Sequence, residues 1–438
     1  MALIAQEPVN AVRAAGGASR PYAWVVFALL FGLLLSDYMS RQVLNAVFPL
    51  LKAQWGLSDT ELGSLSGVVS VMVGLLTFPL SLAADRWGRV ASLKLMALVW
   101  SLATIACGLA ESYGQMFGAR FLVGVGEAAY GSVGLAVVLS IFPAHLRSTL
   151  AGSFLAGGVF GSVLGMALGG GIGAQLGWRW SFYAMGIFGL VVLAMFAAVV
   201  TEKRVGEARD PGDRAAAATR RFSFRTLLPG LFSARSVVFA YAGSGLQLFI
   251  VGSLIAWLPS VLNRHYAMPL REASATAALF VLLSGVGMIA CGGFTDRMGR
   301  NAPGRKFAIA VTYSLCTALM LGLAFRLEPG TAQLVLIGFG IFLAGGTTGP
   351  ATAMVANVTH ASIHATAFAT LSLANNLLGM APGPIVTGVL ADRVGLLTAF
   401  QWTPLACVAA AACFYTAGRL FPADAARLAA AGEIPAAR

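Results

Sequence analysis

Long apolar runs separated by short polar segments dominate the chain. Twelve of them can be distinguished, near residues 22–48, 60–84, 92–110, 114–141, 150–173, 179–200, 236–262, 273–294, 306–326, 331–356, 364–389 and 396–418. A helix needs about 20 apolar residues to cross the hydrocarbon core of a bilayer. The pattern therefore predicts an all-α polytopic membrane protein with twelve transmembrane helices.

One long polar segment, residues 201–235, divides these runs into two sets of six. It is rich in arginine, which favours a cytoplasmic linker. We expect one six-helix bundle over residues 22–200 and a second, related to it by pseudo-symmetry, over residues 236–418. Residues 1–21 and 419–438 are expected to form short cytoplasmic tails.

Composition agrees with a membrane location. The chain is 58% hydrophobic and 11% charged, whereas soluble domains carry about 25% charged residues. The net charge of +12 is spread over short clusters between apolar runs, so it does not indicate nucleic-acid binding.

The distribution of basic residues predicts the orientation. With both termini in the cytoplasm, six of the 29 Lys and Arg residues lie outside and two lie within spans, which leaves 21 on the cytoplasmic side. Such a bias is the positive-inside rule. The abundance of Arg, Ala and Gly is typical of a GC-rich bacterial genome, so we expect the bacterial inner membrane.

No pattern predicts catalysis or a bound cofactor. The five cysteines lie singly in apolar runs, without the spacing of a metal site. No phosphate-binding loop is present, so the sequence does not favour ATP-driven transport. We expect neither enzymatic activity nor a metal.

A repeated motif indicates internal duplication. The pattern D-R-x-G-R occurs 211 residues apart, as Asp85, Arg86, Gly88 and Arg89 and again as Asp296, Arg297, Gly299 and Arg300. Gly177 and Phe182 recur as Gly395 and Phe400, at an offset of 218. Duplicated halves are a common plan of secondary carriers.

The twin motif resembles the loop signature of the major facilitator superfamily, G-x-x-x-D-R-x-G-R-(K/R). The second copy matches from Gly292 through Arg300, whereas the first has Ser81 where the family usually has Gly and Val90 where a basic residue is common. The resemblance extends from about residue 22 to 418. It implies a transporter, expected as a monomer, that works by alternating access between its halves.

The same resemblance implies that this loop is a gating latch. Asp85 at a helix end can accept hydrogen bonds from a neighbouring helix N-terminus and pair with Arg89. The alternative is that the arginines only anchor the topology.

Ionisable residues inside predicted spans are costly and usually functional. Asp37 and Arg41 lie four residues apart on one helix face and can pair, and Asn45 extends that polar stripe by one turn. Arg120 and Glu127 lie seven residues apart, which is about two turns, so they also share a face. All of these residues belong to the first half.

The segment from Arg120 to Ala128 resembles the motif R-x-x-x-G-x-G-E-A of two branches, the anion:cation symporters and the spinster-like transporters. The resemblance implies proton coupling by Glu127 and anion binding by Arg41 and Arg120. These branches commonly carry an Asp immediately before the first arginine, where this chain has Ser40. Asp37, one turn earlier, either replaces that second proton site or only orients Arg41.

Proton coupling also has a physical basis. Burial disfavours an ionised carboxylate and a nearby arginine favours it. Glu127 can therefore change its protonation when an anionic substrate competes for the arginine. The alternative is a permanent structural ion pair.

Further candidates for substrate contact are polar but uncharged. They are Tyr38 and Tyr130 in the first half and Tyr241, Gln247, Asn375 and Asn376 in the second. Each could contact a substrate or a neighbouring helix.

Together these features favour proton symport of a small organic anion, a carboxylate or sugar acid. The proton is then the coupling ion, and no other cofactor is expected. Spinster-like transport of a lysolipid or another amphiphile is the alternative. A transporter-like sensor is a third option, but no appended signalling domain supports it.

Overall fold

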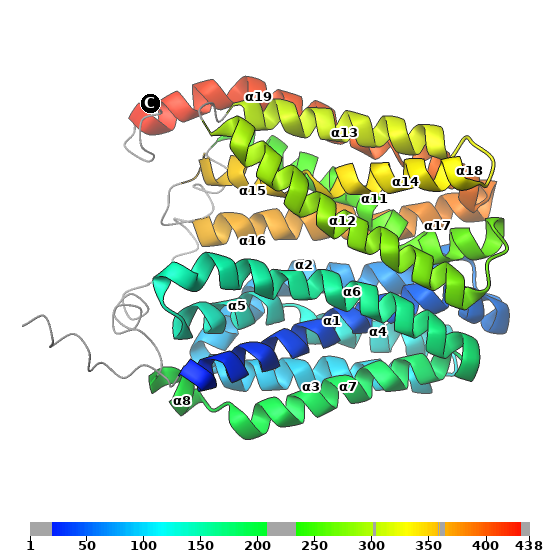
Figure 1. The fold of residues 1–438 in the computed structure, drawn as a ribbon, viewed down its shortest axis with the longest axis horizontal. Coiled ribbons are helices and arrows are strands. Elements are labelled where there is room, and N and C mark those ends of the chain that lie inside the picture. The colour runs from blue at the N-terminus through cyan, green and yellow to red at the C-terminus, as the bar shows by residue number, and fades with distance from the viewer. Residues whose placement is uncertain (1–19, 208–233, 301–303, 358, 360–363, 431–438) are drawn as a thin grey trace, which may run out of the picture.

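The computed structural model describes residues 20–207, 234–300, 304–357, 359 and 364–430. Every regular element in that part of the chain is helical. Figure 1 shows the elements up to α8 gathered on one side and those from α11 onward on the other. Most of the expected N-terminal tail, the linker after residue 207 and the last eight residues lie outside the described residues.

The first half carries eight helices and one short 3₁₀ turn, Ala144–Leu146. The helices are α1 (Arg20–Trp55), α2 (Asp59–Trp87), α3 (Arg89–Leu109), α4 (Tyr113–Glu127), α5 (Tyr130–Ile141), α6 (Arg147–Leu176), α7 (Trp178–Val199) and α8 (Glu202–Glu207).

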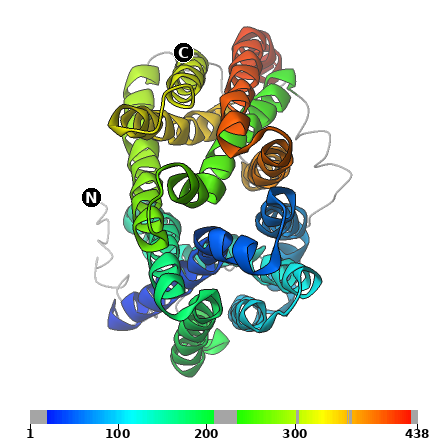
Figure 2. The same ribbon diagram turned by 90° about the vertical axis from the view of Figure 1, so that its right-hand side faces the viewer.

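The second half is likewise built of helices, and Figure 2 shows both halves end-on. Its helices are α11 (Arg235–His265), α12 (Leu270–Gly299), α13 (Arg305–Ala324), α14 (Thr331–Gly345), α15 (Thr348–Asn357), α16 (His364–Ala374), the π-helix η4 (Asn375–Met380), α17 (Pro382–Val394), α18 (Leu396–Trp402) and α19 (Leu405–Ala430).

Eleven stretches of the described residues are long and apolar enough to cross a membrane. The run predicted as one helix over residues 364–389 is instead divided into α16, η4 and α17. The π-turn widens the helix there, and Pro382 and Pro384 have no N–H to continue the α-helical hydrogen bonds. The predicted eleventh span is therefore helical but contains a π-turn, and the all-α fold is confirmed.

The duplication is visible in the helix breaks. The first half has a break between Glu127 and Tyr130, and the second has one between Gly345 and Thr348, so both edges differ by 218 residues. The offset equals that of Gly177 and Gly395. These two glycines both have left-handed φ, +91° and +84°, a conformation that favours glycine. The two halves therefore share backbone features that the sequence shows only faintly.

The halves meet closely where α2 packs against α17. A Cβ on Gly63 would overlap the carbonyl oxygen of Pro384, and one on Gly67 would lie 2.7 Å from that of Ala381. Backbones can approach so closely only where side chains are absent. This contact lies toward the Asp59 end of α2.

Candidate functional site

A charged cluster lies where α1 meets the end of α4. The Nε atom of Arg41 lies 3.3 Å from Oδ1 of Asp37 and 2.7 Å from Oε2 of Glu127. Both carboxylate side chains are buried, whereas 18% of the Arg41 side chain is exposed. The Tyr38 ring centroid lies 5.2 Å from the guanidinium carbon of Arg41. The structure thus brings together four of the residues selected from the sequence.

Local structure explains this meeting. Asp37 and Arg41 are one turn apart on α1, and Glu127 is the last residue of α4 before the break. At that break the carbonyl oxygen of Ala128 accepts a hydrogen bond from Thr77 Oγ1 at 2.6 Å. The helix end is therefore held by α2, which fixes the position of the Glu127 carboxylate.

Arg120 occupies a different environment from Arg41. It is 1% exposed, and its guanidinium donates to the carbonyl oxygens of Ser40 at 2.9 Å, Leu65 at 3.3 Å and Arg41 at 3.4 Å. Glu127, which shares its helix face, pairs with Arg41 instead. The two arginines therefore have distinct contacts, one with carboxylates and the other with the main chain.

The charges of the cluster cancel. Asp37 and Glu127 supply two negative charges when ionised, and Arg41 and Arg120 supply two positive charges. Burial makes an unbalanced charge costly. A change in the protonation of one carboxyl group thus leaves a net positive charge in the cluster.

Two other first-half candidates are engaged with the protein. Tyr130 donates its hydroxyl to the carbonyl oxygen of Leu30 at 2.8 Å and packs edge-on against Trp100. Asn45 donates its amide to Gln42 Oε1 at 2.7 Å.

The second-half candidates lie on α11 and around the π-helix. Asn375 accepts a hydrogen bond from Ser244 at 2.7 Å, and Asn376 donates to the carbonyl oxygen of Ser372 at 2.9 Å. Gln247 is fully buried, and neither of its amide atoms has a hydrogen-bond partner among the described residues. Tyr241 is also buried and lies six residues before Gln247 on α11. Within the described chain, none of the three amide side chains is hydrogen bonded to the Arg41 cluster.

The first D-R-x-G-R copy forms a sharp junction between α2 and α3. Gly88 has a φ of +102°, and Arg89 pairs with Asp85 at 2.9 Å as expected. The N-terminus of α3 is capped by a residue from another helix. Glu202 of α8 accepts from the amide of Arg89 at 3.2 Å and from that of Val90 at 2.8 Å.

The second copy differs in detail. The α12 helix continues through Gly299, and Asp296 pairs with Lys306 of α13 at 2.8 Å. Arg86 and Arg297 occupy the last turns of α2 and α12. Arg300 follows directly as the C-cap residue of α12.

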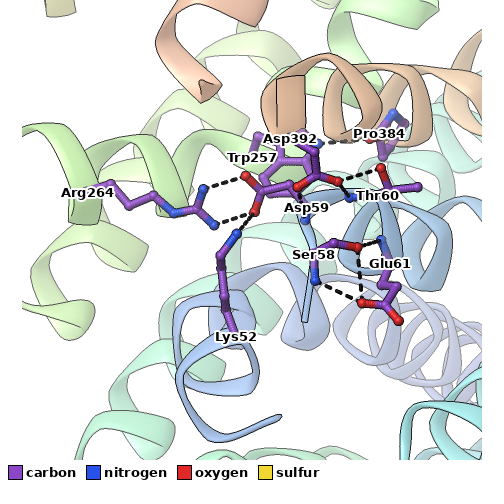
Figure 3. Close-up of polar contacts among 9 residues, drawn as sticks. All are labelled: Lys52, Ser58, Asp59, Thr60, Glu61, Trp257, Arg264, Pro384 and Asp392. Carbon is purple, nitrogen blue, oxygen red and sulfur yellow. Dashed lines mark hydrogen bonds and ion pairs between the residues drawn. The ribbon is translucent and has the colours of Figure 1, made fainter. Parts of the chain in front are cut away.

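A polar contact between the halves, which we call the clasp, lies at the other end of α2 (Figure 3). It consists of Lys52, Asp59 and Thr60 from the first half and Arg264 and Asp392 from the second. Arg264 donates to both oxygens of Asp59, at 2.8 and 2.7 Å, and Lys52 adds a third contact at 2.6 Å.

Asp392 completes the clasp by capping α2 from the opposite half. Its carboxylate accepts hydrogen bonds from the amides of Asp59 and Thr60, both at 2.8 Å, and from the Thr60 hydroxyl at 2.6 Å. Sequence reasoning missed the clasp because its partners from the two halves lie more than 200 positions apart. The local signal that was present, Ser58 and Glu61 in capping-box spacing, indicates only where α2 begins.

The fold agrees with that of known proteins. The family model of the Major Facilitator Superfamily matches residues 30–384. The chain belongs to the major facilitator superfamily. It is therefore a multi-pass membrane transporter.

Relatives come from two branches of this superfamily. A probable L-galactonate transporter of Escherichia coli (strain K12) is 25% identical over 334 residues, covering 72% of this chain and 71% of its own. The sphingosine-1-phosphate transporter SPNS2 of Danio rerio is 26% identical over 388 residues, covering 84% and 75%.

A solved structure shares the fold. A bacterial homologue of the human lysosomal transporter Spinster, in an inward-facing and unoccupied conformation, matches with a TM-score of 0.80 and 19% identity. The match covers 93% of this chain and 99% of that one.

Proposed function

We propose that this transporter moves a small organic anion, a carboxylate or sugar acid, by alternating access and proton symport. The observation that carries the proposal is Arg41. It is a cation within a membrane-spanning helix, held by two buried carboxylates, yet part of its side chain is exposed. Such groups are costly in a membrane and usually mark substrate or ion pathways. The relatives named for organic acids support the same substrate class.

The cluster provides a way to couple proton and anion. While Glu127 is ionised, it occupies Arg41 at 2.7 Å and the four charges cancel. Protonation of Glu127 removes the closer of the two ion pairs of Arg41 and leaves one net positive charge, which attracts a substrate carboxylate. Arginine binds carboxylates well because its N–H groups match both oxygens. By linkage, a bound anion favours the protonated form of Glu127 to the same extent.

The orientation follows from the distribution of basic residues. We propose that both termini and the D-R-x-G-R loops face the cytoplasm of a bacterial cell and that the clasp faces outside. An inward proton gradient would then drive uptake.

Uptake by proteoliposomes tests the proposal. The purified protein is reconstituted and offered labelled L-galactonate, glucuronate and gallate under an inward proton gradient. Glu127→Gln should abolish gradient-driven accumulation and retain exchange of anions across the membrane. Glu111→Gln is the matched control, since Glu111 is exposed in the segment between α3 and α4. Full accumulation by Glu127→Gln would show that Glu127 does not carry the proton.

One relative gives specific support to a second candidate, transport of an amphiphile. The sphingosine-1-phosphate transporter SPNS2 of Danio rerio matches 84% of this chain, and the substrate in its name is an amphiphile. Movement of a lysolipid in the same proteoliposomes, with no uptake of the three acids, would establish this candidate in place of the first.

A further inference from the structure

Arg120 is a buried cation whose hydrogen-bond partners all belong to the main chain. All three of its hydrogen bonds go to main-chain carbonyl oxygens, two on α1 and one on α2. In the described residues no carboxylate lies within ion-pair distance of its guanidinium. Burying a charge costs several kcal/mol unless hydrogen bonds compensate for it. The carbonyl groups provide that compensation here, and they engage three of the five N–H donors of the guanidinium.

Two of these carbonyl groups lie next to each other on α1. They belong to Ser40 and to Arg41 itself. Helix carbonyl oxygens already accept a hydrogen bond from the residue four positions later, so Arg120 adds a second bond at that point of α1. The effect is to hold the α1 backbone against α4 where the Arg41 side chain begins.

The same helix contacts Arg41 a second time. Glu127 lies two turns after Arg120 on α4 and binds the Arg41 side chain. One contact thus fixes the main chain of Arg41, and the other binds its guanidinium. Both contacts join α4 to α1 at the same residue, Arg41.

We propose that Arg120 is a positioning residue that sets the register of α1 against α4, and that Arg41 alone contacts the anion. This inference rests on the proposed function, in which Glu127 carries the proton. The Ser40 carbonyl oxygen, rather than an acidic side chain, receives the Arg120 guanidinium.

Arg120→Lys separates the two roles. Lysine keeps the positive charge near Glu127 and loses the planar set of donors that reaches three carbonyl oxygens. We expect the KM for gallate or L-galactonate to change by less than about threefold, whereas Arg41→Lys should raise it about tenfold or more. Maximal gradient-driven uptake should fall about tenfold in Arg120→Lys.

A second measurement requires no substrate. The protonated carboxyl group of Glu127 gives an infrared band, which is assigned by its loss in Glu127→Gln. The intensity of this band is measured as a function of pH. If Arg120 holds Arg41 in place, Arg120→Lys should move the midpoint by about one pH unit, in the same direction as Arg41→Lys. A tenfold rise in KM with an unmoved midpoint would overturn the inference, as would no change in either quantity.

Wild-type protein offers a test that does not depend on the variants folding. Phenylglyoxal modification, read by mass spectrometry, should label Arg41 but not Arg120, and gallate should protect Arg41. Labelling of Arg120 that gallate prevents would make Arg120 a direct ligand. If none of the acids is transported, the proposed function fails, while the infrared titration still decides the role of Arg120.

Discussion

Asp59→Asn should shift the protein toward the conformation in which the clasp is open. Asp59 is 4% exposed and binds Arg264 of the other half through two charge-assisted hydrogen bonds. Its contact with Lys52 lies within one half and does not resist separation. A hydrogen bond to a charged group contributes about 1.5–3 kcal/mol, and asparagine keeps one acceptor. We therefore expect a loss of about 2 kcal/mol, which changes the ratio of closed to open clasp about 30-fold.

Spin labels can measure this ratio. Ala53→Cys and Glu272→Cys place labels on exposed positions near the clasp, one in each half, in a background whose five native cysteines are replaced. Electron-electron distance measurements should show a longer distance gaining population in Asp59→Asn.

Glu61→Gln is the control for this experiment. It alters the capping box of the same helix turn but removes no contact between halves. If Asp59→Asn leaves the distance distribution unchanged, or if Glu61→Gln opens the clasp equally, the clasp does not hold the halves together.

Two glycine substitutions give further predictions, with Gly114→Ala as the control because a Cβ there meets open space. Gly63→Ala should separate the two halves at the clasp, because the new methyl group overlaps the Pro384 carbonyl oxygen. The same spin-label assay should then show the longer distance, and an unchanged distance distribution would contradict the close packing. Gly88→Ala should destabilise the protein by about 1–3 kcal/mol, because its φ of +102° is unfavourable for alanine. A thermal midpoint in detergent equal to that of Gly114→Ala would refute the second expectation.

The fold was largely predictable because lipid imposes a simple rule. Each span must hide its backbone in a helix and expose apolar side chains, so long apolar runs predict the elements directly. The twin D-R-x-G-R loops then indicated the duplication. The break at the π-helix was not predicted, because Asn375 and Pro382 interrupt a run whose hydropathy remains high.

The charged cluster was predictable only in part. Helical spacing was enough to pair Asp37 with Arg41, since both lie on α1. Spacing also placed Arg120 and Glu127 on one face of α4, but it could not show that Glu127 reaches Arg41 while Arg120 binds main-chain carbonyl groups. Those partners depend on how α1, α2 and α4 pack, and no local pattern records that.

The N-terminus of α2 has two sets of caps, and they come from different halves. Ser58 and Glu61 cap it from within the first half, while Asp392 caps it from the second. When the halves separate, Asp392 leaves but the capping box remains. The first turn of α2 therefore does not need to unravel, and the helix can move as a rigid rod. Opening then breaks contacts between the halves without unfolding a helix end, and closing requires no segment to refold.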